Sequence, residues 1–236
     1  MHDVAEELLP PYDGIKMAHV RLVKTERDAA EALAALSAMD VIGFDTESKP
    51  TFLKGEVSTG PHLVQLATDE AAYLFQIGAG PAGDVLGSVL KTVLESKAIL
   101  KVGFGLQDDV KRLRAKLGID TSNVLDLSTA LRKGERNTLG AKTAVARFFG
   151  QKLQKSKKIT TTNWALPRLS EKQILYAADD AHVALKIYRH WRKDQAASTV
   201  PQATTSTRHR IALAQAGAHS AHAMSQLEPK SAAVTR

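Results

Sequence analysis

The sequence predicts an α/β domain with a mixed sheet flanked by helices. Two apolar runs that read as a hairpin come early in the 236-residue chain. Alternation of helix and strand follows, and the last part of the domain reads as helical. A hairpin followed by such alternation favours a sheet with both parallel and antiparallel strands. Ligands of these sheets bind at strand ends, so the functional residues are expected there.

The first half of the chain carries the hairpin. Acids at the start of an Ala-rich stretch predict a helix over 25–39, and the apolar run 41–45 predicts a short buried strand. Residues 48–62 contain two prolines and two glycines and are expected to form a loop. The apolar runs 63–67 and 72–75 flank a polar turn, which predicts two paired strands.

The second half of the chain alternates and then becomes helical. Apolar spacing predicts the remaining strands and helices. The expected strands are 98–103 and 124–125, and the expected helices are 85–94, 108–117, 126–132, 138–149 and 171–192. The last helix has the clearest start, because Ser170 and Gln173 stand at the two positions of a capping box.

Three regions are expected along the chain. Residues 1–20 form an arm packed on the domain, residues 21–192 form the domain, and residues 193–236 form a disordered tail. The tail has no Phe, Tyr or Trp and is rich in Ala, Ser, Thr and Gln, so it can bury little apolar surface.

The composition excludes several classes of protein. The chain has no cysteine, which removes disulfides, thiolate metal sites and a cysteine nucleophile. The N-terminus has acids and a Pro pair where a secretion signal needs a basic start and an apolar run. No stretch approaches the ~20 apolar residues of a membrane span. A soluble, cytoplasmic protein with no membrane partner is therefore expected.

The positive charge of the chain is concentrated in one segment. The formal net charge is +7, and residues 132–158 contain nine basic residues and one acid. This distribution indicates a polyanionic partner. A solvated helix face beside a lysine-rich loop explains the same pattern equally well.

Two carboxylates follow the predicted strand 41–45. Asp45 and Glu47 are two residues apart, so on a continued strand both point to one side. A hard divalent cation such as Mg²⁺ or Mn²⁺ would relieve their repulsion. Alternatively the strand has ended and both acids are solvated, which is the commoner case for an isolated pair.

Further acids occur at two other element ends. Asp108 and Asp109 open a helix, where acids interact favourably with the helix dipole, and Asp109 flanks the buried stripe of that helix. Tyr176 and Asp180 are four residues apart on an Ala-rich helix, so they share one face. An acid among alanines needs a partner. Asp179 is expected to be exposed to solvent.

Three motifs together resemble the DEDD superfamily of 3′–5′ exonucleases, in the ribonuclease D and Werner-exonuclease-like group. The first motif is Phe44-Asp-Thr-Glu47, and the second is Val102-Gly-Phe-Gly-Leu-Gln-Asp-Asp109. The third is Tyr176-x-x-x-Asp180. They occur in the family's order, and the resemblance spans about residues 20–192.

The resemblance also indicates a subclass. Leu175 stands where one subclass has its catalytic His, whereas Tyr176 matches the Tyr subclass. His182 follows the last motif acid and does not fit the His role. By spacing, Asp109 rather than Asp108 is the second-motif acid.

The resemblance implies an RNase H-like, DnaQ-like exonuclease fold and a site that binds two divalent cations, Mg²⁺ or Mn²⁺. The cation ligands would be Asp45, Glu47, Asp109 and Asp180, and Tyr176 would orient the attacking water. Hydrolysis from the 3′ end of a single strand, DNA or RNA, would release 5′-nucleoside monophosphates.

Residues that contact nucleic acid are less sharply indicated. The backbone of Thr46 is expected at the terminal nucleotide. The lysines expected on a flexible loop near the third motif, at the strand's approach, are Lys155, Lys157 and Lys158. Trp164 either stacks on a base or, as is more usual before a helix, belongs to the core.

Three other functions stay open. One is a nucleic-acid-binding module without catalysis on the same fold. Another is a metal-dependent phosphatase for a small phosphoester, which would not need the basic segment. The last is a structural role of the tail. The sequence chooses neither DNA nor RNA and does not give the oligomeric state.

Overall fold

The computed structural model of the protein describes residues 8–52, 55–78, 83–132 and 137–199. The chain divides into two units, Met1–Lys193 and Asp194–Arg236, and the first contains the sheet. Its strands are β1 (Val20–Val23), β2 (Val41–Glu47), β3 (Leu63–Ala67), β4 (Ala72–Gln76), β5 (Leu100–Gly103) and β6 (Val124–Asp126). Its helices are η1 (Met17–His19), α2 (Glu26–Ser37), α3 (Gly83–Glu95), α4 (Gln107–Leu117), α5 (Leu127–Ala130), α6 (Ala141–Phe149), α7 (Lys157–Thr160) and α8 (Glu171–Thr199).

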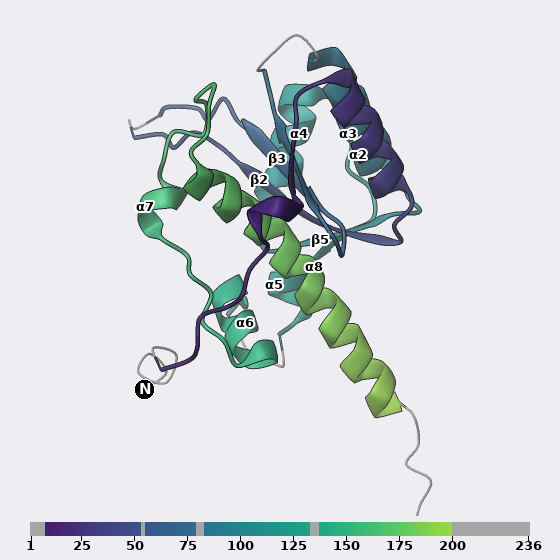
Figure 1. The fold of residues 1–236 in the computed structure, drawn as a ribbon, viewed down its shortest axis with the longest axis vertical. Coiled ribbons are helices and arrows are strands. Elements are labelled where there is room, and N and C mark those ends of the chain that lie inside the picture. The colour runs from purple at the N-terminus through teal and green to yellow at the C-terminus, as the bar shows by residue number, and fades with distance from the viewer. Residues whose placement is uncertain (1–7, 53–54, 79–82, 133–136, 200–236) are drawn as a thin grey trace, which may run out of the picture. The chain divides into compact units, whose positions relative to one another are not determined.

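The six strands form one mixed sheet in the order β1-β4-β3-β2-β5-β6 (Figure 1). Strand β3 runs antiparallel to β2 and β4, and the other pairings are parallel. The C-terminal ends of β1, β4, β2, β5 and β6 therefore meet at one edge, together with the start of β3. Side chains at the end of β2 lie at this edge.

Helices cover both faces of the sheet (Figure 1). On one face α2, α3 and the buried side of α4 pack on residues such as Ile42, Phe44 and Phe75. On the other face α5, α6 and α8 pack on residues such as Val41, Val102 and Leu74. Alternate residues of β2 thus enter two different cores, as the two-residue period of a strand requires.

Helix α8 approaches β2 very closely. A Cβ added at Gly43 would lie 1.9 Å from the carbonyl oxygen of Ala181, so only glycine fits there. The alanines of this helix face, Ala177, Ala178 and Ala181, are fully buried. Small side chains on both elements bring the backbone of α8 against the strand that carries Asp45.

An ion pair secures α8 at the opposite edge of the sheet. Arg189 donates to Asp40 over 2.7 and 3.0 Å and to Asp69 over 3.1 and 3.4 Å. Asp40 precedes β2, and Asp69 lies in the turn between β3 and β4. The helix is thereby tied to two strands that it crosses.

The structure confirms most of the predicted elements. The hairpin, the helix–strand alternation and the helical end are present, and the capping box at the start of α8 forms through Ser170 and Gln173. Strand β1 was not predicted. It is an edge strand whose parallel partner β4 lies about fifty residues away, so no local turn signals it.

Three further expectations need correction. The lysine-rich segment was expected to be a flexible loop, but Lys157–Thr160 forms the short helix α7. The helices expected at 126–132 and 138–149 are shorter, at Leu127–Ala130 and Ala141–Phe149. The helix expected at 171–192 is longer, because α8 ends at Thr199, so residues 193–199 of the expected disordered tail are helical.

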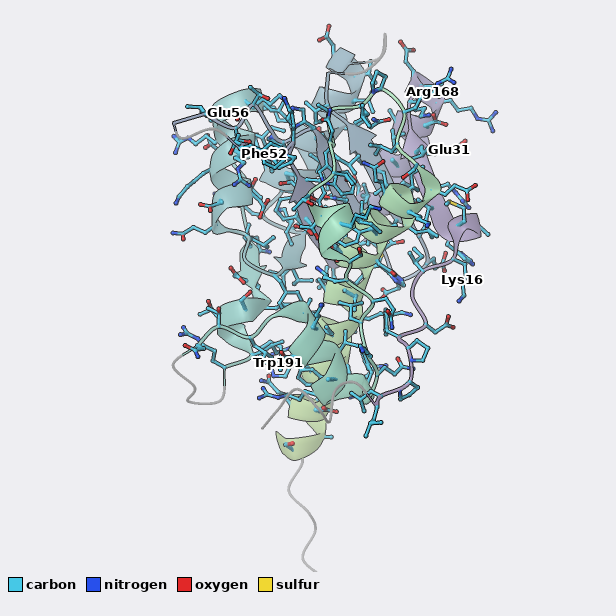
Figure 2. The ribbon with its side chains drawn as sticks, turned by 90° about the vertical axis from the view of Figure 1, so that its left-hand side faces the viewer. Lys16, Glu31, Phe52, Glu56, Arg168 and Trp191 are labelled. Carbon is cyan, nitrogen blue, oxygen red and sulfur yellow. The ribbon has the colours of Figure 1, made fainter. Side chains whose placement is uncertain are left out.

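Phe52, in the loop between β2 and β3, is 79% exposed (Figure 2). In the described part of the chain, no helix combines the length and apolarity needed to cross a membrane.

Candidate active site

Three carboxylates converge where β2 ends. Oxygens of Asp45, Glu47 and Asp180 all lie within 4.8 Å of one another. Asp45 and Glu47 share one side of β2 because the strand continues through Thr46, as one of the two predicted alternatives requires. Asp180 comes from α8, which the contact at Gly43 presses against the same strand. Two rigid elements therefore fix the three acids.

The neighbouring Asp109 is linked to this group through Thr46. The Thr46 hydroxyl donates to Asp109, which is 8% exposed, and the Thr46 backbone N–H donates to Asp45 over 2.9 Å. Asp108, by contrast, is exposed and lies 3.5 Å from Lys111. Of the two adjacent acids, only Asp109 faces the carboxylates, although it lies outside the group of three. Contact of Thr46 with a nucleotide stays a prediction.

Tyr176 lies one helical turn before Asp180. Its hydroxyl is 3.0 Å from the hydroxyl of Thr160, and its ring centroid is 6.1 Å from that of Trp164. Burial, followed by the charge of Asp180, raises the pKa of Tyr176 to about 12. The phenol therefore stays protonated at neutral pH and can donate a hydrogen bond.

Lys155 inserts its ammonium group among the acids. Its Nζ lies 2.6 Å from Asp180 and 5.6 Å from the centroid of the Tyr176 ring. Burial disfavours the charge of Lys155, but Asp180, Tyr176 and Asp45 outweigh it and raise its pKa. Lys155 is thus an internal counterion of the site.

The other residues of the basic segment are less informative. Lys158 is exposed on α7, and the side chain of Lys157 lies outside what the structure describes. Lys133 and Arg136 also lie outside the described residues. Contact of this segment with nucleic acid remains a prediction.

The carboxylates of the site have unusual electrostatics. Burial, reinforced by Asp180 and Asp109, raises the pKa of Asp45 well above its ordinary value. Burial and the charge of Asp45 raise the pKa of Glu47 to about 9. Burial also raises the pKa of Asp180, against the opposing effect of Lys155. The fold places acids together at a cost that a cation would offset.

These residues fit a hard divalent cation. The donor set consists of carboxylate oxygens alone, which Mg²⁺ and Mn²⁺ prefer. The ammonium group of Lys155 on Asp180 shows that a positive charge is accommodated beside the acids. Asp45, Glu47 and Asp180 could hold such an ion, with Asp109 close enough for its charge to act on Asp45.

Asp179 was expected to be exposed, and this expectation is wrong. Its carboxylate accepts the backbone N–H of Ile15 over 2.7 Å. A Cβ at Gly14 would lie 2.3 Å from the same carboxylate. Burial raises the pKa of Asp179 to about 6. The N-terminal segment covers this acid, and a contact across 164 residues has no local signal in the sequence.

Two other expectations are settled by burial. Trp164 has no exposed surface and belongs to the core, so it is not available to stack on a base. His182 is buried, and its Nε2 lies 3.4 Å from the carbonyl oxygen of Asp69, in the turn that also binds Arg189. His182 therefore lies at the other edge of the sheet from the acids, as expected of a residue without the His role.

Sequence reasoning assigned no role to Gln65. It lies opposite Asp45 in the β2–β3 pairing and is fully buried. Neither polar atom of its side chain has a hydrogen-bond partner among the described residues. The available signal was a polar residue inside the otherwise apolar run Leu63-Val-Gln-Leu66. Such a group beside a carboxylate cluster belongs to the polar surroundings of the site.

The sheet order, the helices on both faces and the acids at strand ends define an RNase H-like exonuclease fold. Solved structures agree. The EXO domain of Aedes aegypti Nibbler matches with a TM-score of 0.69 at 26% identity, over 80% of this chain and 94% of that one. RNase D of Escherichia coli matches with a TM-score of 0.61 at 24% identity, over 80% and 48%. RNase D of Trypanosoma brucei, solved in complex with RNA U12, matches with a TM-score of 0.64 at 21% identity, over 79% and 64%.

The family is shown by sequence. A family model described as 3′-5′ exonuclease matches residues 20–195, well over half of the chain, so the chain belongs to this family. The mouse bifunctional 3′-5′ exonuclease/ATP-dependent helicase WRN is 31% identical over 156 residues, which cover 65% of this chain and 11% of that protein. An Arabidopsis thaliana 3′-5′ exonuclease is 26% identical over 179 residues, 73% of this chain. The chain spans only 57% of that second relative.

Proposed function

We propose that the chain is a metal-dependent 3′–5′ exonuclease of the Tyr subclass. It hydrolyses a single strand from its 3′ end and releases 5′-nucleoside monophosphates. The observation that carries the proposal is the convergence of Asp45, Glu47 and Asp180 within 4.8 Å, one helical turn from Tyr176. Membership of the 3′-5′ exonuclease family supports it.

The carboxylates act as cation ligands in this proposal. Asp45, Glu47, Asp109 and Asp180 would hold two Mg²⁺ or Mn²⁺ ions. Bound ions of this kind activate water and neutralise charge on a phosphodiester. The protein's contribution is rigidity, because β2 and α8 fix the acids before any ion arrives.

Tyr176 orients the water that attacks the phosphorus. A phenol whose pKa is about 12 is a poor base at neutral pH. It is a suitable hydrogen-bond donor, and its ring is held by Trp164 behind it. Loss of the hydroxyl would therefore slow hydrolysis and leave cation binding largely intact.

Positive side chains guide the strand to the acids. Lys155 lies among the carboxylates and would move toward a substrate phosphate as cations take over its role at Asp180. Thr46, Lys157 and Lys158 are the further candidates for contacts with the strand. Contacts of this kind give affinity without sequence preference.

The main alternative is a nucleic-acid-binding module without catalysis. A module of that kind has no need to hold one buried and two half-buried acids within 4.8 Å of one another, with the pKa of Glu47 raised to about 9. A phosphatase for small phosphoesters would keep the acids but would bind its substrate with weak dependence on salt.

The test uses one strand carrying a label at its 3′ end or at its 5′ end, prepared as DNA and as RNA. The wild-type chain, with Mg²⁺ or Mn²⁺, should release the 3′ label first as a mononucleotide and shorten the 5′-labelled strand stepwise. Asp45→Asn should abolish cleavage of both labelled strands, and Asp108→Asn, at an exposed acid, should keep it. Binding without cleavage under all these conditions would favour the alternative module.

A further inference from the structure

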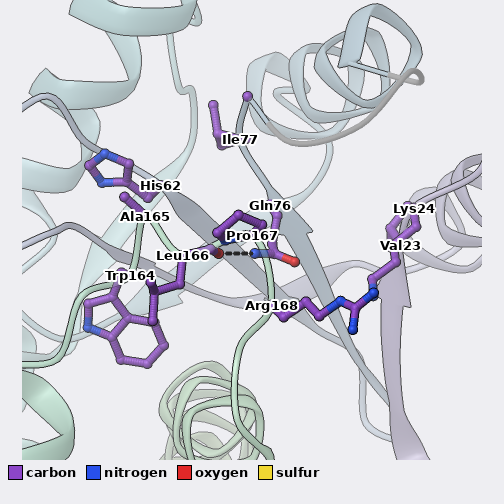
Figure 3. A pocket seen from close by; sticks show the side chains of 11 residues that line it. Val23, Lys24, His62, Gln76, Ile77, Trp164, Ala165, Leu166, Pro167 and Arg168 are labelled. Carbon is purple, nitrogen blue, oxygen red and sulfur yellow. Dashed lines mark hydrogen bonds between the residues drawn. The ribbon is translucent and has the colours of Figure 1, made fainter.

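A cavity of about 450 Å³ adjoins the carboxylate site at the same edge of the sheet. Its walls are the ends of β1 and β4, His62 before β3, and the segment 164–168 before α8 (Figure 3). Gln76 donates to the carbonyl oxygen of Leu166 over 3.1 Å and ties this segment to the sheet (Figure 3). The cavity therefore lies between the end of the sheet and the segment 164–168.

Two contacts connect the cavity with the acids. The backbone N–H of His62 donates to the carbonyl oxygen of Glu47 over 2.8 Å. Trp164 belongs to the lining segment 164–168, and its buried ring lies 6.1 Å from the ring of Tyr176, measured between centroids. A ligand in the cavity would thus be next to the residues that surround the reacting phosphate.

The charge of the cavity is positive. Lys24 and Arg168 line it, no acid does, and neither cation forms an ion pair among the residues that the structure describes. Both side chains are exposed, and Arg168 lies on the outside of the molecule (Figure 2). Burial, followed by the charges of Lys116 and Lys49, lowers the pKa of His62, so further positive charge lies near this wall.

The remaining lining is apolar. The apolar side chains that line the cavity include Ile77, Leu166 and Pro167. Leu166 is 43% exposed. An anionic group beside an apolar body is the chemistry of a nucleotide, whose phosphate binds Arg and Lys and whose base packs on apolar side chains. A volume near 450 Å³ lies within the range of small-ligand sites.

We propose that this cavity binds a second nucleotide, beside the one that the carboxylate site removes. Its phosphate would contact Arg168 and Lys24, and its base would lie against Leu166 and Ile77. The nucleotide is either a neighbouring unit of the substrate strand or a free nucleoside monophosphate. The inference rests on the proposed function for the identity of the strand, but the binding itself can be tested without cleavage.

The experiment measures binding to the full chain in EDTA, where no strand is cut. The probes are a dinucleotide, an eight-nucleotide single strand and a nucleoside 5′-monophosphate. Arg168→Glu and Lys24→Glu are compared with Lys91→Glu, an equal charge change on the exposed side of α3. Thermal melts verify that each variant folds.

We expect Arg168→Glu and Lys24→Glu to weaken binding of the eight-nucleotide strand about fivefold or more, and Lys91→Glu to change it less than twofold. If the monophosphate loses affinity as well, the cavity takes free nucleotide; if only the strand does, it takes a neighbouring unit. Equal affinities for all variants with all probes would overturn the proposal.

Cleavage of the dinucleotide with Mg²⁺ separates the two proposals. Lys91→Glu, outside both the cavity and the carboxylate site, should cleave saturating dinucleotide at the wild-type rate. If the wild type cleaves the dinucleotide but Arg168→Glu and Lys24→Glu bind every probe as the wild type does, the proposed nucleotide site in the cavity is wrong and the exonuclease proposal stands. No cleavage by the wild type, with the binding differences present, contradicts the exonuclease and keeps the cavity.

Discussion

At the scale of single residues, Glu47 shows what assembling the site costs. The pKa of its carboxyl is raised to about 9, mainly by burial and then by Asp45. In the unfolded chain the same group titrates near 4.5. The folded state therefore binds more protons than the unfolded state between these values. In the absence of cations, the contribution of Glu47 to stability is therefore highest below about pH 4.5 and is lost as pH rises toward 9.

Glu47→Gln should remove this pH-dependent loss. In EDTA at pH 8 we expect the variant to be more stable than the wild type by about 1–2 kcal/mol, which is roughly 2–8 °C in Tm for a domain of this size. Thermal melts from pH 5 to 9 measure it. The Tm values of the variant and the wild type should converge toward pH 5. A constant difference in Tm at every pH would contradict a raised pKa of Glu47.

Lys155 balances the acids from within the site. Its removal leaves Asp180 with a buried charge and without an ion-pair partner among the described residues. Lys155→Met should therefore lower Tm in EDTA by several degrees. Addition of Mg²⁺ should raise the Tm of this variant more than it raises the Tm of the wild type. Lys158→Met, at an exposed position on α7, is the matched control. Equal melting points for both variants in EDTA would show that Lys155 is not a counterion.

At the scale of elements, the contact between β2 and α8 sets the distance between Asp45 and Asp180. The Cβ of an alanine at position 43 would meet the carbonyl group of Ala181. Gly43→Ala should cost about 1–3 kcal/mol and reduce cleavage, because the helix must move away from the strand. Thermal melts and single-turnover cleavage measure both effects.

Gly87 provides the control for this substitution. It lies inside α3, and a Cβ there meets nothing within 4 Å. Gly87→Ala should raise stability by about 0.5–1 kcal/mol, through the better helix propensity of alanine, and leave cleavage unchanged. A similar loss in both variants would mean that the close approach at Gly43 is unimportant.

The elements also show why sequence reasoning succeeded where it did. Alternation along β2 placed Asp45 and Glu47 on one side, and helical spacing placed Tyr176 next to Asp180. Both placements follow from the periodicity of a single strand or helix, which relates residues that are close together in the sequence. Lys155 at Asp180 depends instead on where the segment after α6 passes over the site, which no local pattern encodes. The resemblance to a family joined the three motifs, because nothing within any one motif indicates the other two.

At the scale of the whole molecule, the N-terminal segment completes the fold around α8. Ile15 belongs to the same buried cluster as Ala178, its N–H donates to Asp179, and Tyr12 stacks on Phe149 with ring centroids 6.0 Å apart. Burial of Asp179 could not be predicted because this segment lies at the other end of the chain. The site itself lies entirely within Met1–Lys193.

Two truncations test whether the N-terminal segment stabilises the fold and whether the residues after 199 are dispensable. Deletion of residues 200–236 should leave Tm within about 2 °C of the full chain and cleavage unchanged, because every residue assigned to the site precedes them. Deletion of residues 1–16 should lower Tm by several degrees, since it removes Ile15 from the core and leaves Asp179 without its backbone partner. Loss of activity on deleting the C-terminal residues would instead indicate a role for them in the site.

The most direct test of the account is calorimetric titration of Mn²⁺ into the full chain. The central claim is that acids from β2 and α8 form one cation site. Wild type and Asp108→Asn should bind with the same affinity, and Asp180→Asn should bind about tenfold more weakly or worse. Equal affinities for Asp180→Asn and Asp108→Asn, or no binding by the wild type, would contradict the claim.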